Sequence, residues 1–258
     1  MNRPDDNQTT ANTSELPLLD RRAFLKGGAA VATFTLAPGI ILYTTAEARN
    51  IDERATDKVR WAMLIDSTLC EQGCSECVTA CQDENGWGSN EIKSRPSQQA
   101  QWIRKVELKN SETGMLHSLP MMCQHCANPP CVDVCPTTAS FKRADGIVLV
   151  DRHLCIGCRF CMMACPYKAR SFVHETLTNQ KSNAPRGKGC VEACTLCVHK
   201  LDAGDGTTAC AQACSKGAIL VGDLKDQNSE LAKRVSKYAT TQIRADLGLN
   251  TGVRYQGI

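Results

Sequence analysis

The chain has 258 residues, a formal net charge of +3 and an aromatic content of 5%. No run of lysine and arginine is interleaved with aromatic residues, so the usual signature of nucleic-acid binding is absent. Its 17 cysteines set it apart from ordinary globular domains. Because large apolar side chains are scarce, we expect much of the interior to be filled by inorganic cofactors and short aliphatic side chains.

The N-terminus has the features of a Tat export signal. A pair of arginines at 21–22 precedes a moderately apolar stretch over 27–43 and an Ala-Glu-Ala cleavage motif. The position before the pair, usually Ser or Thr, is Asp20 here. We predict that residues 1–48 are the signal peptide and that the folded protein is exported to the periplasm. Two alternatives stay open, an uncleaved N-terminal anchor and a cytosolic chain with a chance arginine pair.

Sixteen of the seventeen cysteines fall into four groups of four. The third group reads C-I-G-C-R-F-C-M-M-A-C-P, the bacterial ferredoxin run in which three cysteines bind one cluster and the fourth binds its neighbour. Four groups therefore predict two reciprocal pairs and four [4Fe–4S] clusters. The groups are Cys70, Cys74, Cys77 and Cys81; Cys123, Cys126, Cys131 and Cys135; Cys155, Cys158, Cys161 and Cys165; and Cys194, Cys197, Cys210 and Cys214.

A disulfide framework or zinc sites are the alternative interpretations of so many cysteines. Disulfide frameworks suit short secreted chains and do not require this spacing, whereas structural zinc usually takes two separated C-x-x-C pairs. The first group has an extra residue between its first two cysteines, and in the fourth, twelve residues separate C-T-L-C from C-A-Q-A-C. Export after folding also fits the iron–sulfur interpretation, because clusters installed in the cytoplasm protect their thiolates from oxidation outside it.

The elements around the cysteines form an internal repeat. Apolar strands are predicted over 61–66 and 146–151, each ending in an Asp that precedes the first cysteine of a group, with an offset of 85 residues. Short helices are predicted over 77–81 and 161–165, each ending in the fourth cysteine of its group. The repeat indicates paired modules of one kind.

Further elements follow from turn and periodicity signals. A hairpin is predicted over 140–150, turning at Asp-Gly, and a loop over 179–189. A strand is predicted over 218–221 and a helix over 229–247. The fold class is therefore predicted as α+β, with paired bacterial-ferredoxin-like modules.

Over residues 59–223 the chain resembles a known family, the four-cluster iron–sulfur subunits of membrane redox complexes. These are related to the iron–sulfur subunits of dimethyl sulfoxide, polysulfide, tetrathionate and nitrite reductases. The stretch T-A-S-F-K-R-A-D-G-I-V-L-V-D, with the Tat signal, is most similar to the periplasmic DsrO-type subunit of the DsrMKJOP complexes of sulfur-metabolising bacteria. The segments that carry the family resemblance are M-L-I-D, C-Q-H-C-A-N-P-P-C-V-D-V-C-P, G-I-V-L-V-D-R-H-L-C-I-G-C-R-F-C-M-M-A-C-P-Y-K-A-R and C-T-L-C-V-H-K.

The resemblance implies how the groups share clusters. Residues 122–186 would form a dicluster module inserted into an outer one, which is made by 49–121 and by 187–258 with its C-terminal helical segment. The implied ligand sets are Cys70, Cys74, Cys77 and Cys214 for cluster 1; Cys123, Cys126, Cys131 and Cys165 for cluster 2; Cys155, Cys158, Cys161 and Cys135 for cluster 3; and Cys194, Cys197, Cys210 and Cys81 for cluster 4.

The resemblance also implies a function, electron transfer without a catalytic site of its own. The expected partners are an integral membrane, quinone-interacting subunit of the polysulfide reductase membrane-subunit type and a multihaem cytochrome c or another redox subunit. The protein would be peripheral to the membrane and held there by these partners. The alternative is an electron-relay subunit of a molybdopterin reductase, such as tetrathionate or polysulfide reductase. An independent enzyme would need an iron with a vacant site, whereas each predicted cluster has four cysteines.

Several residues near the groups are interpreted apart from the ligand sets. Cys190, four residues before Cys194, is interpreted as a free thiol. His125 lies between two predicted ligands, where we expect a surface histidine rather than one that tunes a cluster. Five basic residues surround groups two and three, and we expect ordinary solvated side chains rather than a role in tuning potentials; they are Lys142, Arg143, Arg159, Lys168 and Arg170.

Overall fold

The computed structural model describes residues 53–88, 95, 98–178 and 180–258, and the predicted signal peptide lies outside them. The fold described below belongs to the unit Ala46–Ile258. Within the described residues, no helix combines the length and the apolarity needed to cross a membrane.

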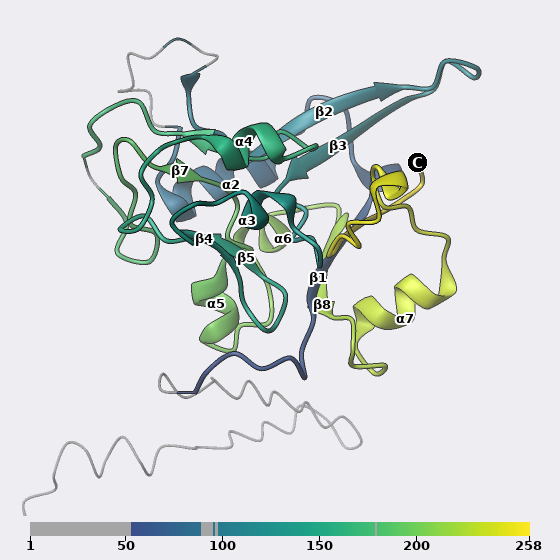
Figure 1. Ribbon diagram of the computed structural model, residues 1–258. Helices are drawn as coiled ribbons and strands as arrows, with labels where there is room; N and C mark the ends of the chain where they lie inside the picture. Colours follow the sequence, from purple (N-terminus) through teal and green to yellow (C-terminus); the bar gives the residue numbers. More distant parts are fainter. Residues whose placement is uncertain (1–52, 89–94, 96–97, 179) are drawn as a thin grey trace, which may run out of the picture. The chain divides into compact units, whose positions relative to one another are not determined.

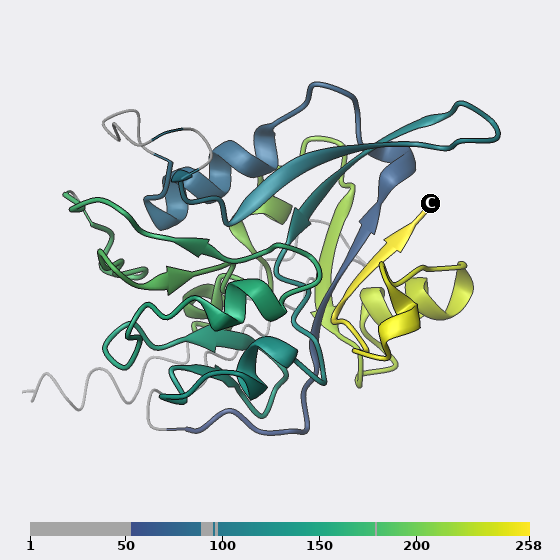
Figure 2. The same ribbon diagram turned by 45° about the horizontal axis from the view of Figure 1, so that its top comes forward.

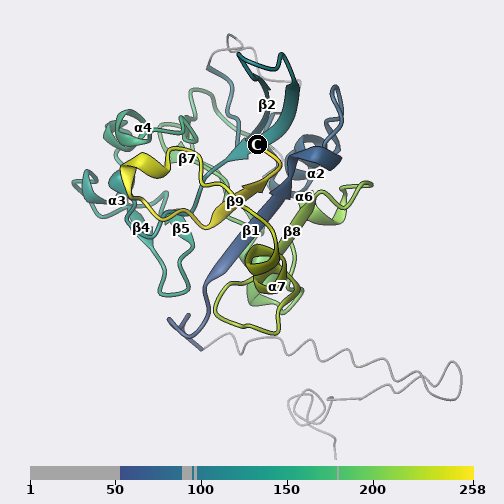
Figure 3. The same ribbon diagram turned by 90° about the vertical axis from the view of Figure 1, so that its right-hand side faces the viewer.

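A three-stranded sheet organises this unit (Figures 1 and 3). Strand β1 (Trp61–Asp66) is central, antiparallel to β8 (Ile219–Asp223) and parallel to β9 (Val253–Gln256). Its two neighbours come from the far end of the chain. The sheet therefore brings the segment before the first cysteine group next to the segment after the fourth.

Strand β1 is apolar on both faces because both faces are covered. Met63 and Ile65 lie in the main core. On the opposite face, Leu64 packs against Leu231 of helix α7 (Glu230–Lys237), which lies beside the sheet in Figure 3. Burial on both sides explains why the strand reads as an almost continuous hydrophobic run.

The remaining elements are short. The longest hairpin joins β2 (Ile103–Lys109) to β3 (Leu116–Met122) and extends beyond the neighbouring helices (Figure 2). Helix α2 packs on α6, and α3 packs on α4. The other elements are η1 (Ser67–Leu69), α2 (Glu76–Asn85), α3 (Pro130–Asp133), β4 (Ser140–Lys142), β5 (Val148–Val150), α4 (Phe160–Ala164), β6 (Ser171–Phe172), β7 (Val191–Glu192), α5 (Val198–Asp202), α6 (Ala209–Gln212) and η3 (Ala245–Leu247).

The mixture of short helices and small sheets agrees with the α+β prediction. The hairpin predicted over 140–150 is formed by β4 and β5. The helix predicted over 229–247 is wrong in extent, since α7 ends at Lys237 and only the short 3-10 helix η3 follows within this range. Tyr238 adopts an extended backbone, and Thr241 instead pairs with Tyr255 of β9. Cross-strand pairing therefore overrides the helical periodicity there.

Arg60 joins three distant segments just before β1. Its guanidinium donates hydrogen bonds to the carbonyl oxygens of Gly146 and His125, both at 2.9 Å. Its backbone N–H donates to a carboxylate oxygen of Asp223 at 2.7 Å. One residue thus ties the start of β1 to the β4–β5 turn and to the loop of the second cysteine group.

We expect Arg60→Ala to destabilise the fold, because it removes charged donors and leaves two carbonyl groups without them. The expected loss is about 2–3 kcal/mol, or a thermal midpoint lower by roughly 4–12 °C. The measurement is the midpoint of cluster bleaching at a fixed heating rate. Arg54→Ala is the control, since this exposed side chain should change stability by less than about 0.5 kcal/mol. Equal midpoints for the two variants would contradict the role given to Arg60.

Candidate iron–sulfur cluster sites

The cysteines lie on short helices, directly after a strand, or in the loops between elements. Two lie on α2 and two follow β3, while α3, α4 and α6 each carry one and loops hold the others. All seventeen cysteines are within the described residues, as free thiols. Because α2 packs on α6 and α3 packs on α4, the first group meets the fourth and the second meets the third.

The first and fourth groups meet at two places. Around Cys77, the thiols within electrostatic range are those of Cys70, Cys74 and Cys214. Burial raises the pKa of the Cys77 thiol to about 11. These four residues are the ones predicted to bind cluster 1, and their bonds to iron remain a prediction.

The second meeting place surrounds Cys194. Its thiol lies within electrostatic range of Cys81, Cys210 and Cys197, and burial raises its pKa well above the ordinary value. Cys81 comes from α2 and Cys210 from α6, so the reciprocal exchange follows the packing of these two helices. The four residues are the predicted ligands of cluster 4.

The second and third groups meet in the same reciprocal way. Cys126 lies within electrostatic range of Cys123, Cys131 and Cys165, the other predicted ligands of cluster 2. Burial raises the pKa of Cys123 and of Cys126 to about 12. All four line one small cavity, together with prolines, Tyr167 and Arg170.

The predicted site of cluster 3 is more open. Cys161 is buried and lies within electrostatic range of Cys155 and Cys135, both half-buried. Cys158, on the loop between Cys155 and Cys161, is exposed. Three of the four thiols are therefore brought together inside the protein, and the fourth faces the solvent.

The donor set fits iron–sulfur clusters. Burial of an unpaired thiol opposes its thiolate form, and bound iron reverses this preference because a coordinating thiol is deprotonated. The cavity of cluster 2 also contains orphaned donors: the Tyr167 hydroxyl and two nitrogens of Arg170 have no hydrogen-bond partner among the described residues. Acceptors such as cluster sulfides would satisfy them.

Several sulfur atoms accept hydrogen bonds that tune such clusters. Lys105 Nζ donates to Cys70 Sγ at 2.7 Å, and Trp87 Nε1 donates to Cys81 Sγ at 3.2 Å. Backbone N–H groups donate to other sulfurs, for example Ser140 to Cys135 at 3.3 Å. Spacing along the sequence did not reveal Lys105 or Trp87, because neither lies in a cysteine group.

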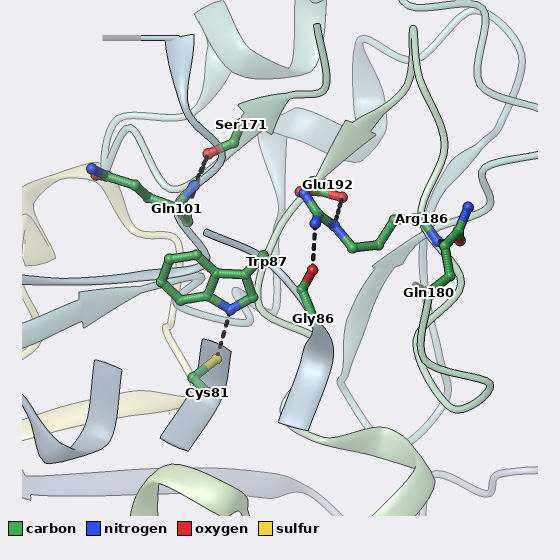
Figure 4. Close-up of polar contacts among 8 residues, drawn as sticks. All are labelled: Cys81, Gly86, Trp87, Gln101, Ser171, Gln180, Arg186 and Glu192. Atoms are coloured by element: carbon green, nitrogen blue, oxygen red, sulfur yellow. Dashed lines mark hydrogen bonds and ion pairs between the residues drawn. The ribbon is translucent and has the colours of Figure 1, made fainter. Parts of the chain in front are cut away.

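Trp87 sits beside a buried ion pair that holds the end of α2 (Figure 4). Arg186 pairs with Glu192 at 2.6 Å and donates to the Gly86 carbonyl at 2.6 Å. The segment that leads into the fourth cysteine group is thereby fixed against the C-terminal end of α2, the helix that carries Cys77 and Cys81.

The structure corrects the expectation for His125, which is not at the surface. Its side chain is 1% exposed, and its Nδ1 accepts a hydrogen bond from the Val148 N–H at 3.1 Å. Burial lowers its pKa to about 3, so the ring is neutral. Its Nε2 has no hydrogen-bond partner among the described residues.

Cys190 is buried, and its interpretation as a free thiol outside the ligand sets stays a prediction. Its sulfur donates to the Arg152 carbonyl oxygen at 3.3 Å. The expectation of solvated basic side chains holds for Lys142, Arg159 and Lys168, which are exposed. It is wrong for Arg170, which is 5% exposed, and for Arg143, which is half-buried and paired with Asp145 and Asp202.

Comparison with known proteins identifies the cysteine-rich region. A family model described as a 4Fe-4S dicluster domain matches residues 115–224, and a second of the same description matches residues 69–139. These matches support iron–sulfur clusters over zinc or disulfides. Two such domains and the grouped cysteines show four [4Fe–4S] clusters.

Relatives in other organisms are subunits of redox complexes. The chain is 40% identical to "Hdr-like menaquinol oxidoreductase iron-sulfur subunit 1" of Archaeoglobus fulgidus, over 92% of this chain and 98% of the relative. It is 38% identical to a tetrathionate reductase subunit of Salmonella typhimurium, over 77% of this chain and 73% of the relative. It is 35% identical to "Menaquinone reductase, iron-sulfur cluster-binding subunit" of Nitratidesulfovibrio vulgaris, over 70% and 83%. The chain belongs to this family of iron–sulfur electron-transfer subunits of oxidoreductase complexes.

Proposed function

We propose that the chain is a periplasmic electron-transfer subunit of a sulfur-metabolism membrane complex of the DsrMKJOP type, exported through the Tat pathway. In this role it relays electrons between a quinone-reactive membrane subunit and other redox subunits, and it has no catalytic site of its own. Its [4Fe–4S] clusters supply one-electron transfer at potentials that the surrounding protein sets.

The observation that carries the proposal is the contrast in exposure among the predicted ligands. All four ligands of cluster 2 are buried, as are three of the four for cluster 4. Cluster 1 has three half-buried ligands, and cluster 3 has two half-buried ligands and the exposed Cys158. A series of clusters in which buried clusters 2 and 4 lie between the accessible clusters 1 and 3 suits an electron relay that meets a partner protein at each end.

Several large apolar side chains near Cys158 in the sequence are exposed, beside the exposed Arg159. Ile156 is 68% exposed and Met163 is 66% exposed, and three further large apolar side chains beside the ligands of cluster 3 are exposed. An apolar patch of this kind is typical of a protein interface. We assign this Cys158 face, formed by Val134, Leu154, Ile156, Phe160 and Met163, to the quinone-interacting membrane subunit.

The surface around Cys74 is polar instead. It is hollowed and lined by charged side chains that include Glu71, Glu76, Asp83 and Lys216. A hydrated surface of this kind suits a partner that binds reversibly, such as a multihaem cytochrome c or another redox subunit. The two accessible ends therefore suit two different kinds of partner.

A second candidate function is the relay subunit of a molybdopterin reductase acting on tetrathionate or polysulfide. It is favoured by the 38% identity to the tetrathionate reductase subunit. The menaquinol oxidoreductase subunit matches over 98% of its own length, which favours a quinone-linked complex. A neighbouring gene for a molybdenum enzyme would decide for the second candidate.

The test of the membrane partner uses the Cys158 face. We expect the native chain to co-purify with a quinone-binding membrane protein, and Ile156→Glu to bind it roughly 10–100-fold more weakly, because a charge would be buried at the interface. Met115→Glu is the matched control, since Met115 is 60% exposed at the turn of the β2–β3 hairpin, outside the Cys158 face. A native chain that purifies alone, or equal binding by both variants, would count against the assignment.

The loop of cluster 3 gives a second test. Gly157 has a φ of +72°, and an added Cβ would lie 2.2 Å from the Gly189 carbonyl oxygen. Gly73, the equivalent in the first group, has a φ of +75° and no atom within 4 Å of such a Cβ. Each alanine variant carries about 1–2 kcal/mol of backbone strain, but only Gly157→Ala also displaces a neighbouring chain segment.

We therefore expect Gly157→Ala to lose the EPR signal of cluster 3, whereas Gly73→Ala keeps four clusters. Iron content per chain provides the second measurement. Four intact clusters in Gly157→Ala would show that this close approach does not shape the site.

Cys190→Ala should keep all four clusters, because the buried thiol donates to the Arg152 carbonyl oxygen and each predicted ligand set is complete without it. Cys194→Ala should lose cluster 4. Iron analysis and EPR compare the two variants directly. Loss of a cluster in Cys190→Ala would transfer the ligand role to that residue.

A further inference from the structure

Arg170 is a buried cation without a carboxylate partner among its main interactions. Its side chain lies just before β6 and is 5% exposed. Its Nε and Nη1 atoms have no hydrogen-bond partner among the described residues. Buried charges are normally paired, and unsatisfied buried donors are costly, so this position requires acceptors that the described residues do not provide.

The surroundings of Arg170 are cysteines from two predicted clusters. The side chain lines the cavity of the cluster 2 ligands. The groups that most favour its charge are Cys131 and Cys123, which belong to cluster 2, and Cys161, which belongs to cluster 3. The guanidinium also forms side-chain contacts with the sulfurs of Cys131 and Cys161.

The other basic residues nearby have partners of their own. Lys142 donates to the Ala127 carbonyl oxygen at 2.6 Å, and Arg159 stacks 3.8 Å from the ring centre of Phe172. Arg143 bonds to the carboxylates of Asp145 and Asp202. Arg170 differs from them in being fully inside the protein and aimed at cysteine sulfur.

A guanidinium at this place has a definite electrostatic effect. Arginine stays charged in proteins, and a buried charge is poorly screened. Reduction adds negative charge to a cluster, so a nearby cation favours the reduced form, as do N–H donors to sulfur. One planar group with several donors can serve two neighbouring sites at once.

We propose that Arg170 is a positioning residue shared by clusters 2 and 3, which raises the reduction potentials of both and lessens their repulsion when both are reduced. The inference rests on the ligand sets proposed for these two clusters. It gives the inserted module a buried cation that faces cysteine sulfur, in contrast to the half-buried Lys105 at Cys70 and the neutral donors Trp87 and Asn85 at Cys81.

The test is a redox titration of the cluster-loaded full chain by EPR, with iron content measured in parallel. Cys126→Ser and Cys158→Ser assign the signals, because each should change one cluster, 2 or 3. If they do not change different clusters, the ligand sets fail, independently of Arg170. We expect Arg170→Gln to keep four clusters and to lower the midpoint potentials of clusters 2 and 3, leaving those of clusters 1 and 4 unchanged. Arg143→Gln, in the same module, should shift none.

A shift of only one of the two potentials, of neither, or of all four equally would overturn the proposal. If Arg170→Gln fails to assemble the clusters, Arg170→Lys decides instead. Its shorter side chain donates from one nitrogen and cannot serve both sites, so we expect four clusters with at least one of the two potentials lowered. Loss of cluster 2 or 3 in this variant, or native potentials for both, would indicate a purely structural role and reject the inference.

Discussion

The convergence of buried thiols on shared sites is the constraint on which this structure depends. Burial raises the pKa of thiols such as Cys77 and Cys123, so the protein alone resists the thiolate form that iron requires. The bound clusters supply the compensating positive charge, and folding and cofactor binding become one process. The core reflects this, since cysteines stand beside Met63 and Ile65 in the main hydrophobic cluster. Short elements suffice because the cofactors replace a part of the apolar interior.

Chain topology turns local spacing into reciprocal sites. The central position of β1 between β8 and β9 joins segments more than 150 residues apart and so brings α6, just before β8, to α2. Packing of α2 on α6 and of α3 on α4 then brings the groups together in the pairs that the predicted ligand sets require. Spacing alone predicts that a fourth cysteine reaches another cluster, but only tertiary packing selects which one. Arg60, bonded to Gly146, His125 and Asp223, ties these segments at the start of β1.

Sequence reasoning succeeded where the chemistry is local and failed where it depends on distant contacts. The cysteine groups and the β4–β5 hairpin follow from spacing and from a turn dipeptide, both of which act over a few residues. The burial of His125 and Arg170 was missed, because a polar residue beside a ligand looks solvated until the packing around it is known. Lys105 reaches Cys70 across 35 residues, and no periodicity marks such a contact. The helix predicted over 229–247 was too long, because Thr241 pairs with Tyr255 of β9 in the folded chain. Such pairing competes with helical propensity but leaves no sign in the local sequence.

The four ligand loops share one backbone feature that links burial to sequence. The residue before the second cysteine is left-handed in every group: Gly73, His125, Gly157 and Leu196. Glycine stands there in the first and third groups, with open space around Gly73 but a Gly189 carbonyl oxygen 2.2 Å from any Cβ added to Gly157. In the groups with buried clusters, His125 and Leu196 are each 1% exposed. A left-handed conformation costs a non-glycine residue about 1–2 kcal/mol, whereas burying a leucine side chain contributes roughly 1.5–3 kcal/mol. Packing therefore outweighs strain at Leu196, whereas the close approach of a neighbouring chain segment requires glycine at Gly157.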